Sequence, residues 1–239
     1  MKNKIGFWGY PHPNIIKLYK EKYPAFQWID LDIDFGYENT DLLPKSYCKI
    51  IKNIISNSLF YKNELEVIIA PIGKDKCDSG WFASALLKDL GFNVVESVFE
   101  EKTFKTTPLI SVSNLPLRKK VELITERIIK DTSVQIVECK PQFGFWGVPP
   151  NDLSILELFP DSTHLYGWCR CVDAKAPADL DLEMFVDENV PTVFYAQAFC
   201  AKMQLAKYLA NKYGGLYIDI DDVATNSTRA KIEAFLELR

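Results

Sequence analysis

A short segment that occurs twice constrains the fold more than any other feature of the sequence. Gly-Phe-Trp-Gly stands at positions 6–9 and again at positions 144–147. In both copies prolines follow, and then a residue that commonly begins a helix. A repeated segment with the same continuation suggests that the chain contains two related halves.

Two further matches follow the first one in the same order. Cys77, Ala83, Leu86 and Gly91 match Cys200, Ala206, Leu209 and Gly214, and Val112, Arg118, Lys120, Val121 and Glu122 match Val223, Arg229, Lys231, Ile232 and Glu233. The spacing between copies shortens along the chain, as expected if the first half has the longer loops. We therefore predict a duplication with halves at residues 1–139 and 140–239. Chance similarity among α/β units is the alternative.

Short apolar segments alternate with segments of helical periodicity in both halves. We expect strands at 5–8, 27–33, 67–70, 92–98, 143–146, 164–169, 192–196 and 216–220, and helices at 14–22, 44–57, 77–90, 117–130, 153–159, 180–185, 200–213 and 228–238. This alternation predicts parallel sheets covered by helices on both faces. The expected fold is α/β, with two tandem Rossmann-like (flavodoxin-like) halves and a small-molecule cleft between them.

Composition narrows the class of protein and its partners. Of 239 residues, 48% are hydrophobic and 25% are charged, as in ordinary globular proteins. The net charge is -4 and no block of five like charges occurs, so we expect no nucleic-acid partner. The start of the chain lacks the apolar core of a signal peptide, and the longest uncharged run, Asn189–Ala201, is too short to span a bilayer of about 30 Å. We therefore expect a soluble, cytoplasmic protein without a membrane partner.

Six cysteines are spread along the chain: Cys48, Cys77, Cys139, Cys169, Cys171 and Cys200. Because the chain has the size of a full globular protein, we interpret them as thiols rather than as a disulfide framework. No C-x-x-C pair occurs, so neither a thioredoxin-type site nor a standard zinc knuckle is indicated. The primary expectation is a protein without a cofactor.

Cys77 and Cys200 are the candidate catalytic pair. In open parallel sheets, ligands bind at the loops that follow the carboxyl ends of the strands, and both cysteines are expected there, each at the start of a helix. The helix dipole and free backbone N–H groups favour the thiolate form at such positions. One thiolate could remove a proton from a carbon and the other thiol could return one from the opposite side. The alternative is that both are small buried hydrophobic side chains.

This arrangement is similar to the aspartate/glutamate racemase superfamily, which also contains maleate isomerases and arylmalonate decarboxylases. Cys77-Asp78-Ser79 resembles the Cys-Asn-Thr of that family at its first cysteine. The chain departs from the family in its first loop, which is not glycine-rich, and at Cys200, which Ala201 rather than Thr follows. The resemblance implies two α/β halves, one cysteine in each, and cofactor-independent racemase or isomerase chemistry on a small carboxylate.

Arg118 and Arg229 are the candidate ligand-binding cations. They occupy matching places near the starts of the last helix of each half, where a positive charge opposes the helix dipole. This placement favours a role in binding a small anionic molecule, a carboxylate or a phosphate. The alternative is an ion pair one helical turn on, with Glu122 for Arg118 and Glu233 for Arg229.

Four more residues are candidate ligand contacts at the same loops. His12 lies in a Pro-His-Pro segment and could act as a general base, although a solvated histidine is more common. Asp78 could orient a proton beside Cys77 or cap a helix. Trp8 and Trp146 could line a pocket or pack at strand ends.

Cys169-Arg170-Cys171 is the densest thiol motif and supports the alternative of a metal or Fe–S protein. Alternate residues of an extended segment point to the same side, so both sulfurs could face one metal together with Cys77 or Cys200. The more common alternative is two buried strand residues that flank an exposed Arg170. The sequence therefore leaves three function classes open: a two-cysteine isomerase, a non-catalytic anion-binding module and a cysteine-ligated metal protein.

Overall fold

The computed structural model describes residues 2–37, 41–73, 76–100, 106–130 and 135–239 and confirms the α/β fold class. The chain forms two compact units, residues 1–100 and 101–239. Each unit contains one sheet of four parallel strands with helices between the strands. The duplication and the halves 1–139 and 140–239 stay predictions. No helix among the described residues has the length and apolar character needed to cross a bilayer.

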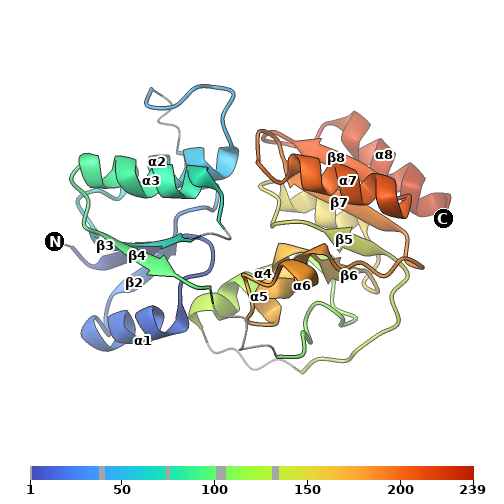
Figure 1. The fold of residues 1–239 in the computed structure, drawn as a ribbon, viewed down its shortest axis with the longest axis horizontal. Coiled ribbons are helices and arrows are strands. Elements are labelled where there is room, and N and C mark those ends of the chain that lie inside the picture. The colour runs from blue at the N-terminus through green and yellow to red at the C-terminus, as the bar shows by residue number, and fades with distance from the viewer. Residues whose placement is uncertain (1, 38–40, 74–75, 101–105, 131–134) are drawn as a thin grey trace. The chain divides into compact units, whose positions relative to one another are not determined.

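The first unit alternates strands and helices along its whole length. Its elements are β1 (Lys4–Phe7), α1 (Pro13–Lys22), β2 (Gln27–Asp30), α2 (Lys49–Phe60), β3 (Leu65–Ile72), α3 (Asp78–Asp89) and β4 (Val94–Val98). The strand order is β2-β1-β3-β4, and every neighbouring pair is parallel. Helix α1 lies on one face of the sheet, and α2 and α3 lie on the other (Figure 1).

The central strands of the first unit are apolar on both sides because helices cover both faces. Ile5, Ile68 and Ile69 are fully buried, and α2 contributes Ile54 and Ile55 to the same core. This continuous apolar character is typical of parallel strands, and it is the reason that the sequence predicts them well.

The second unit repeats the strand topology with shorter strands and helices. Its elements are α4 (Leu117–Ile129), β5 (Gly144–Trp146), the 3-10 helix η1 (Leu153–Leu158), β6 (His164–Tyr166), α5 (Trp168–Asp173), α6 (Leu180–Met184), β7 (Thr192–Gln197), α7 (Met203–Tyr213), β8 (Leu216–Ile220) and α8 (Asn226–Glu237). The strand order is β6-β5-β7-β8, which matches the order in the first unit. The carboxyl ends of the four strands therefore share one edge of the sheet.

Aromatic side chains fill both faces of the second sheet. Phe145 packs edge-on against Phe159, with ring centroids 5.5 Å apart, and stacks with Tyr195 at 5.9 Å. The neighbouring residues Trp146 and Phe194 point to the opposite face, where they pack with α7. This alternation within β5 and β7 is the two-residue period of an extended strand.

Two local expectations were wrong. Residues 164–169 were expected to form one strand, but β6 ends at Tyr166 and α5 begins at Trp168. Gly167 separates them with φ of 68°, a conformation that a side chain would oppose, so the chain turns here. The helix expected at 14–22 begins at Pro13, and His12 caps it, because the Asn14 N–H donates to His12 Nδ1 at 3.1 Å.

Helix α4 packs against η1 and α5, and α8 packs against η1 and β8. Helices α4 and α8 contain the matched residues Arg118 and Arg229. Both helices therefore belong to the same compact unit and contact the same 3-10 helix. The sequence also predicts that segment 134–138 extends a strand between the halves. Its described part forms one isolated antiparallel bridge, between Ser113 and Glu138, and residue 134 lies outside the described residues.

Candidate functional site

The carboxyl edge of the first unit contains two neighbouring aspartates. Asp30 ends β2, and Asp32 follows two residues later. The Gly9 N–H, from the loop after β1, donates to Asp32 Oδ2 at 2.8 Å. Gly9 has φ of 54°, a conformation that favours glycine, so the residue type at this position helps to aim its N–H at the carboxylate.

The Asp32 N–H donates to Asp30 Oδ1 at 3.3 Å, so the two residues are also joined directly. Burial and the negative charge of Asp32 raise the pKa of Asp30 well above its usual value. Burial also raises the pKa of Asp32, although the hydrogen bonds from Asp30 and Gly9 oppose this. A pair of carboxyls that retains a proton is able to act as a general acid.

Two buried asparagines of α2 hold the loop that follows β2. Asn57 Nδ2 donates to the carbonyl oxygens of Leu31 and Ile33, at 2.9 and 2.8 Å. Asn53 Nδ2 donates to the Asp32 carbonyl at 3.1 Å. These bonds fix the backbone that carries Asp32, so the acidic pair sits on a rigid support rather than on a free loop.

His12 lies in the loop after β1, on the same edge. Its ring caps α1, its backbone N–H donates to Ser97 Oγ at 2.8 Å, and its ring centroid is 5.0 Å from that of Phe99. His12 therefore connects the β1 loop to the end of β4. Its proposed role as a general base stays a prediction.

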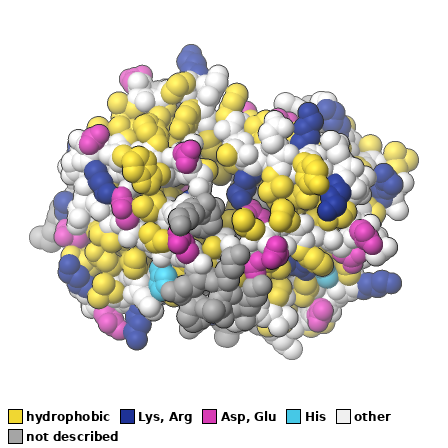
Figure 2. All heavy atoms as spheres, viewed as in Figure 1, with side chains coloured by type: hydrophobic (Ala, Val, Ile, Leu, Met, Phe, Trp, Pro, Cys, Tyr) yellow, Lys and Arg dark blue, Asp and Glu magenta, His cyan; other side chains and the backbone are white. Residues whose placement is uncertain are grey.

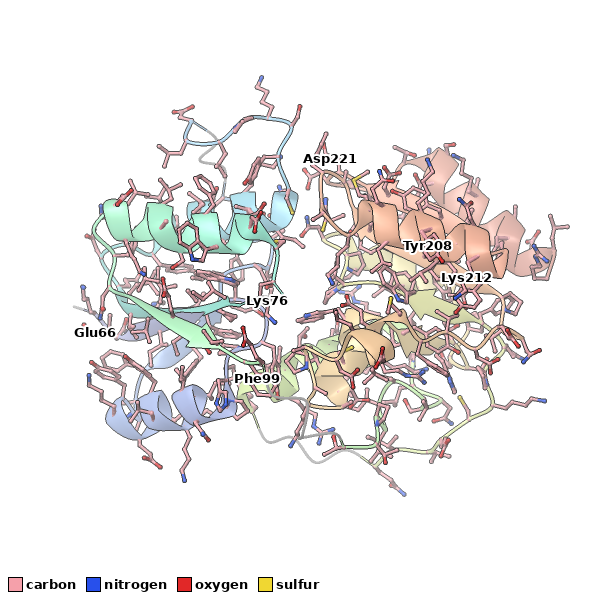
Figure 3. All side chains as sticks on the ribbon, in the orientation of Figure 1. Glu66, Lys76, Phe99, Tyr208, Lys212 and Asp221 are labelled. Atoms are coloured by element: carbon pink, nitrogen blue, oxygen red, sulfur yellow. The ribbon has the colours of Figure 1, made fainter. Side chains whose placement is uncertain are left out.

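Cys77 is the exposed N-cap residue of α3, as expected, and Asp78 is the first residue of that helix. Lys76 and Phe99, labelled in Figure 3, lie beyond the carboxyl ends of β3 and β4, at the far end of the sheet from Glu66. The Cys77 thiol thus belongs to the same edge as Asp30 and Asp32. Asp78 places a negative charge in the first turn of α3, where it interacts favourably with the helix dipole.

Cys200 follows β7 in the second unit but does not begin a helix. It lies two residues before Lys202, the N-cap of α7, in a turn where Phe199 has φ of 61°. The Lys202 N–H points to Cys200 Sγ at 3.5 Å. The expectation that each of the two cysteines stands at the start of a helix is therefore correct for Cys77 but not for Cys200. The alternative that both thiols are buried is wrong, because Cys77 is exposed and Cys200 is half-buried.

At the carboxyl edge of the second unit, Arg229 forms an ion pair. Its Nη2 atom lies 2.8 Å from Asp152 Oδ2 and 2.5 Å from Ser154 Oγ. Asp152 also accepts from the Ala224 N–H at 3.0 Å. Burial alone would raise the pKa of Asp152, but the hydrogen bonds from Ser154 and Ala224 and the charge of Arg229 bring it below its usual value. Arg229 therefore pairs with Asp152 rather than with the expected Glu233. This ion pair connects the loop after β5 to α8.

Arg118 has the ion-pair partner that the alternative interpretation predicted. Its Nε atom lies 2.9 Å from Glu122 Oε1, and its Nη1 atom pairs with Glu157 of η1. All three side chains are substantially exposed. Both candidate anion-binding arginines therefore have carboxylate partners within their own unit, and their ligand-binding role stays a prediction.

The two tryptophans are buried at the ends of their strands. Trp8 follows β1 directly, and Trp146 ends β5 in the core beside Phe194 and α7. Trp146 Nε1 donates to the Glu183 carbonyl at 2.7 Å. These contacts describe packing residues, and a pocket-lining role stays a prediction for both.

Cys169 and Cys171 lie in α5 rather than in an extended segment. Successive residues of a helix are about 100° apart, so these sulfurs do not share one side. Both thiols are buried, and burial raises the pKa of Cys171 to about 12 and also raises that of Cys169, which disfavours the thiolates that bind metals. Among the described residues, no group of three or more His, Cys, Asp or Glu side chains is placed to hold a metal ion.

Acidic and basic side chains are interspersed among the described residues of the face that Figure 2 draws. No protein-family model matches the chain, and no curated protein matches its sequence. The site residues therefore rest on geometry and charge alone.

Sequence analysis identified Cys77 and His12 but missed Asp30 and the two asparagines of α2. Asp30, Asp32 and Asp34 form an Asp-x-Asp-x-Asp pattern at the end of a strand, and this pattern is the signal that could have identified the acidic pair.

Proposed function

We propose that this chain binds a small carboxylate and catalyses cofactor-independent proton transfer at the adjacent carbon, with Cys77 and Cys200 as the acid–base pair. The observation that carries the proposal is the pattern of thiol burial. Cys48, Cys169 and Cys171 are buried, and the half-buried Cys139 precedes β5. Cys77 and Cys200 instead reach solvent from the loops after β3 and β7. Parallel sheets bind ligands at these loops.

The reaction needs one thiolate and one thiol in each turnover. The thiolate takes the proton from the carbon next to the carboxylate and becomes a thiol, and the electron pair of the broken C–H bond moves into the carboxylate as an enediolate. The opposite thiol then gives its proton to the other face of the carbon and becomes a thiolate. No redox equivalent is consumed, and the two cysteines exchange roles when the substrate has the opposite handedness.

Asp30 and Asp32 support proton-transfer chemistry at the Cys77 edge. Their raised pKa values are typical of acid–base sites. The substrate carboxylate would be held by backbone N–H groups or by Arg118 and Arg229. The arginines can do so only if their ion pairs with Glu157 and Asp152 open.

The test is incorporation of deuterium from solvent at the α-carbon of small amino and hydroxy acids, followed by NMR. The proposal expects wash-in with the native protein and at least a 100-fold loss in Cys77→Ala and in Cys200→Ala, the usual order of a missing acid–base group. Cys139→Ala is the matched control, because Cys139 is also half-buried but lies beside His164 at the start of β6. Wash-in that survives both substitutions, or its absence across the substrate panel, contradicts the proposal.

A non-catalytic anion-binding module is the second candidate, and it has one specific observation in its favour. The second unit contains a buried arginine, Arg170, for which no carboxylate partner is present among the described residues. Binding without wash-in, measured on the same panel by calorimetry, would favour this candidate over the isomerase.

A further inference from the structure

Arg170 is a buried cation that forms no ion pair with a residue that the structure describes. Its side chain is 7% exposed, and no acidic oxygen of the described residues lies within 4 Å of its guanidinium. Its Nε atom is buried without a hydrogen-bond partner among those residues. Leaving a charge buried and unpaired is costly, so proteins normally supply a counter-charge or a set of hydrogen bonds.

Two aromatic rings hold the guanidinium in place. Its Cζ atom lies 4.6 Å from the ring centroid of Tyr166, the last residue of β6, and 5.4 Å from that of Phe185, which follows α6. Rings over a guanidinium contact its faces through cation–π interactions. The N–H groups of a guanidinium lie in its plane and can donate to two oxygens at once.

Two carboxylates that interact electrostatically with Arg170, those of Asp173 and Asp187, accept hydrogen bonds from other groups. Asp173 accepts from the Ser111 N–H at 2.9 Å. Asp187 accepts from the backbone and the side chain of Asn189, at 3.0 and 3.2 Å. Both contribute a favourable electrostatic interaction to Arg170, but neither forms an ion pair with it.

Two further basic side chains, Lys120 and His164, lie in the same unit as Arg170. Lys120 is fully buried, and its ammonium donates to the carbonyls of Asp161 and Thr163, at 2.8 and 2.6 Å. His164, the first residue of β6, is also buried, and its pKa is lowered by burial and by the charges of Arg170 and Lys120. Burial likewise lowers the pKa of Lys120 to about 8. Three basic side chains around one short strand thus share an environment that an anion would stabilise.

We propose that Arg170 binds an oxyanion with two coplanar oxygens, a carboxylate or a phosphate group, that completes the buried basic cluster of the second unit. The anion would approach beside Phe185, because this ring is half exposed while the guanidinium beneath it is not. The site is independent of Cys77 and Cys200, and its existence does not require that the protein is an enzyme.

The experiment titrates the full chain with inorganic phosphate and with acetate, against chloride at matched ionic strength. Two readouts are followed: the melting temperature and the ¹⁵N–¹H signal of the Arg170 Nε–H group. The variants are Arg170→Met, which removes the charge, and Arg170→Lys, which keeps the charge but removes the planar fork. Arg239→Met is the matched control, because Arg239 also lies over a ring, Phe235, at 5.7 Å but is exposed.

We expect phosphate or acetate to raise the melting temperature of the native protein by about 2–4 °C, the shift of a ligand that binds only the folded state. The Arg170 Nε–H signal should move during the titration. Arg170→Met should lose the response, Arg170→Lys should keep a fraction of it and Arg239→Met should keep all of it. Without added anion, Arg170→Met should melt no lower than the native protein, because it removes an uncompensated buried charge.

Two results would overturn the proposal. One is an equal anion response in the native protein and in Arg170→Met. The other is that neither the melting temperature nor the Arg170 Nε–H signal of the native protein changes when phosphate or acetate is added. If Arg170→Met does not fold, Arg170→Lys and the native signal decide between these outcomes. A failure of this site leaves the two-thiol proposal standing, because the deuterium test uses neither Arg170 nor its neighbours.

Discussion

The carboxyl edges of the two sheets use aspartate in opposite ways. In the first unit, Asp30 and Asp32 lie against each other, and both have raised pKa values. In the second unit, Asp152 has an arginine and two backbone N–H groups as partners, and its pKa is lowered. The strand order is the same in both sheets, so the difference comes from the loops and not from the topology.

The two arrangements have opposite effects on the stability of the fold. The carboxylate of Asp152 stabilises the fold, because its partners favour the charged form. The pair in the first unit destabilises the folded state at neutral pH, since both carboxyls lose solvation and oppose each other. Groups held at such a cost are more often functional than structural, and this is why the first unit is the better place to look for acid–base chemistry.

The largest expected effect comes from removing the carboxylate of Asp152. Asp152→Ala leaves Arg229 and the Ala224 N–H without their partner, so the free energy of unfolding should fall by about 2–3 kcal/mol. Urea unfolding followed by tryptophan fluorescence measures it. A decrease in the free energy of unfolding below about 0.5 kcal/mol would mean that the Asp152 carboxylate does not stabilise the second unit.

Asp32→Asn should act in the opposite direction and raise the free energy of unfolding at neutral pH by about 1 kcal/mol. The amide still accepts from the Gly9 N–H but carries no charge against Asp30. Because the folded-state pKa values of the pair are raised, the native protein is favoured below them and loses stability as the pH rises through them. The free energy of unfolding of the variant should therefore fall less steeply than that of the native protein as the pH rises above the usual aspartate pKa. Exposed Asp41 provides the control, since Asp41→Asn should leave this pH dependence unchanged, and a stability loss in Asp32→Asn at neutral pH would refute the assignment.

The smallest effect is expected at Glu157, the exposed partner of Arg118. The two side chains are 56% and 44% exposed, so Glu157→Ala should change the free energy of unfolding by less than about 0.5 kcal/mol. The same urea series measures it beside Asp152→Ala. A larger loss would show that Arg118, like Arg229, is part of a structural clamp.

The strands and long helices of this fold could be predicted because their signals are local. The buried strands β3 and β7 are mainly apolar, and α3 ends just before Gly91, a common C-terminal signal. The segment 164–169 was the main error, since His-Leu-Tyr-Gly-Trp-Cys forms one largely apolar run. Only the turn at Gly167, which packs closely against Gly147 and Trp146, divides that run into strand and helix.

The candidate site could be predicted only in part. Placement after a parallel strand identified Cys77, Cys200 and His12 because it follows from topology. The burial of Arg170 and the raised pKa values of Asp30 and Asp32 depend on side chains from several elements, and sequence spacing does not report those contacts. Arg170 was expected to be exposed, and the structure buries it between two rings.

Cross-linking of Cys77 to Cys200 tests the central claim most directly. Proton transfer to both faces of one carbon requires sulfurs within about 10 Å of each other, so a bifunctional thiol reagent shorter than that should join them. We expect a cross-linked peptide pair that contains Cys77 and Cys200, identified by mass spectrometry, and its loss in Cys77→Ala. Full modification of each thiol by separate reagent molecules, without any Cys77–Cys200 cross-link, would contradict the two-thiol mechanism.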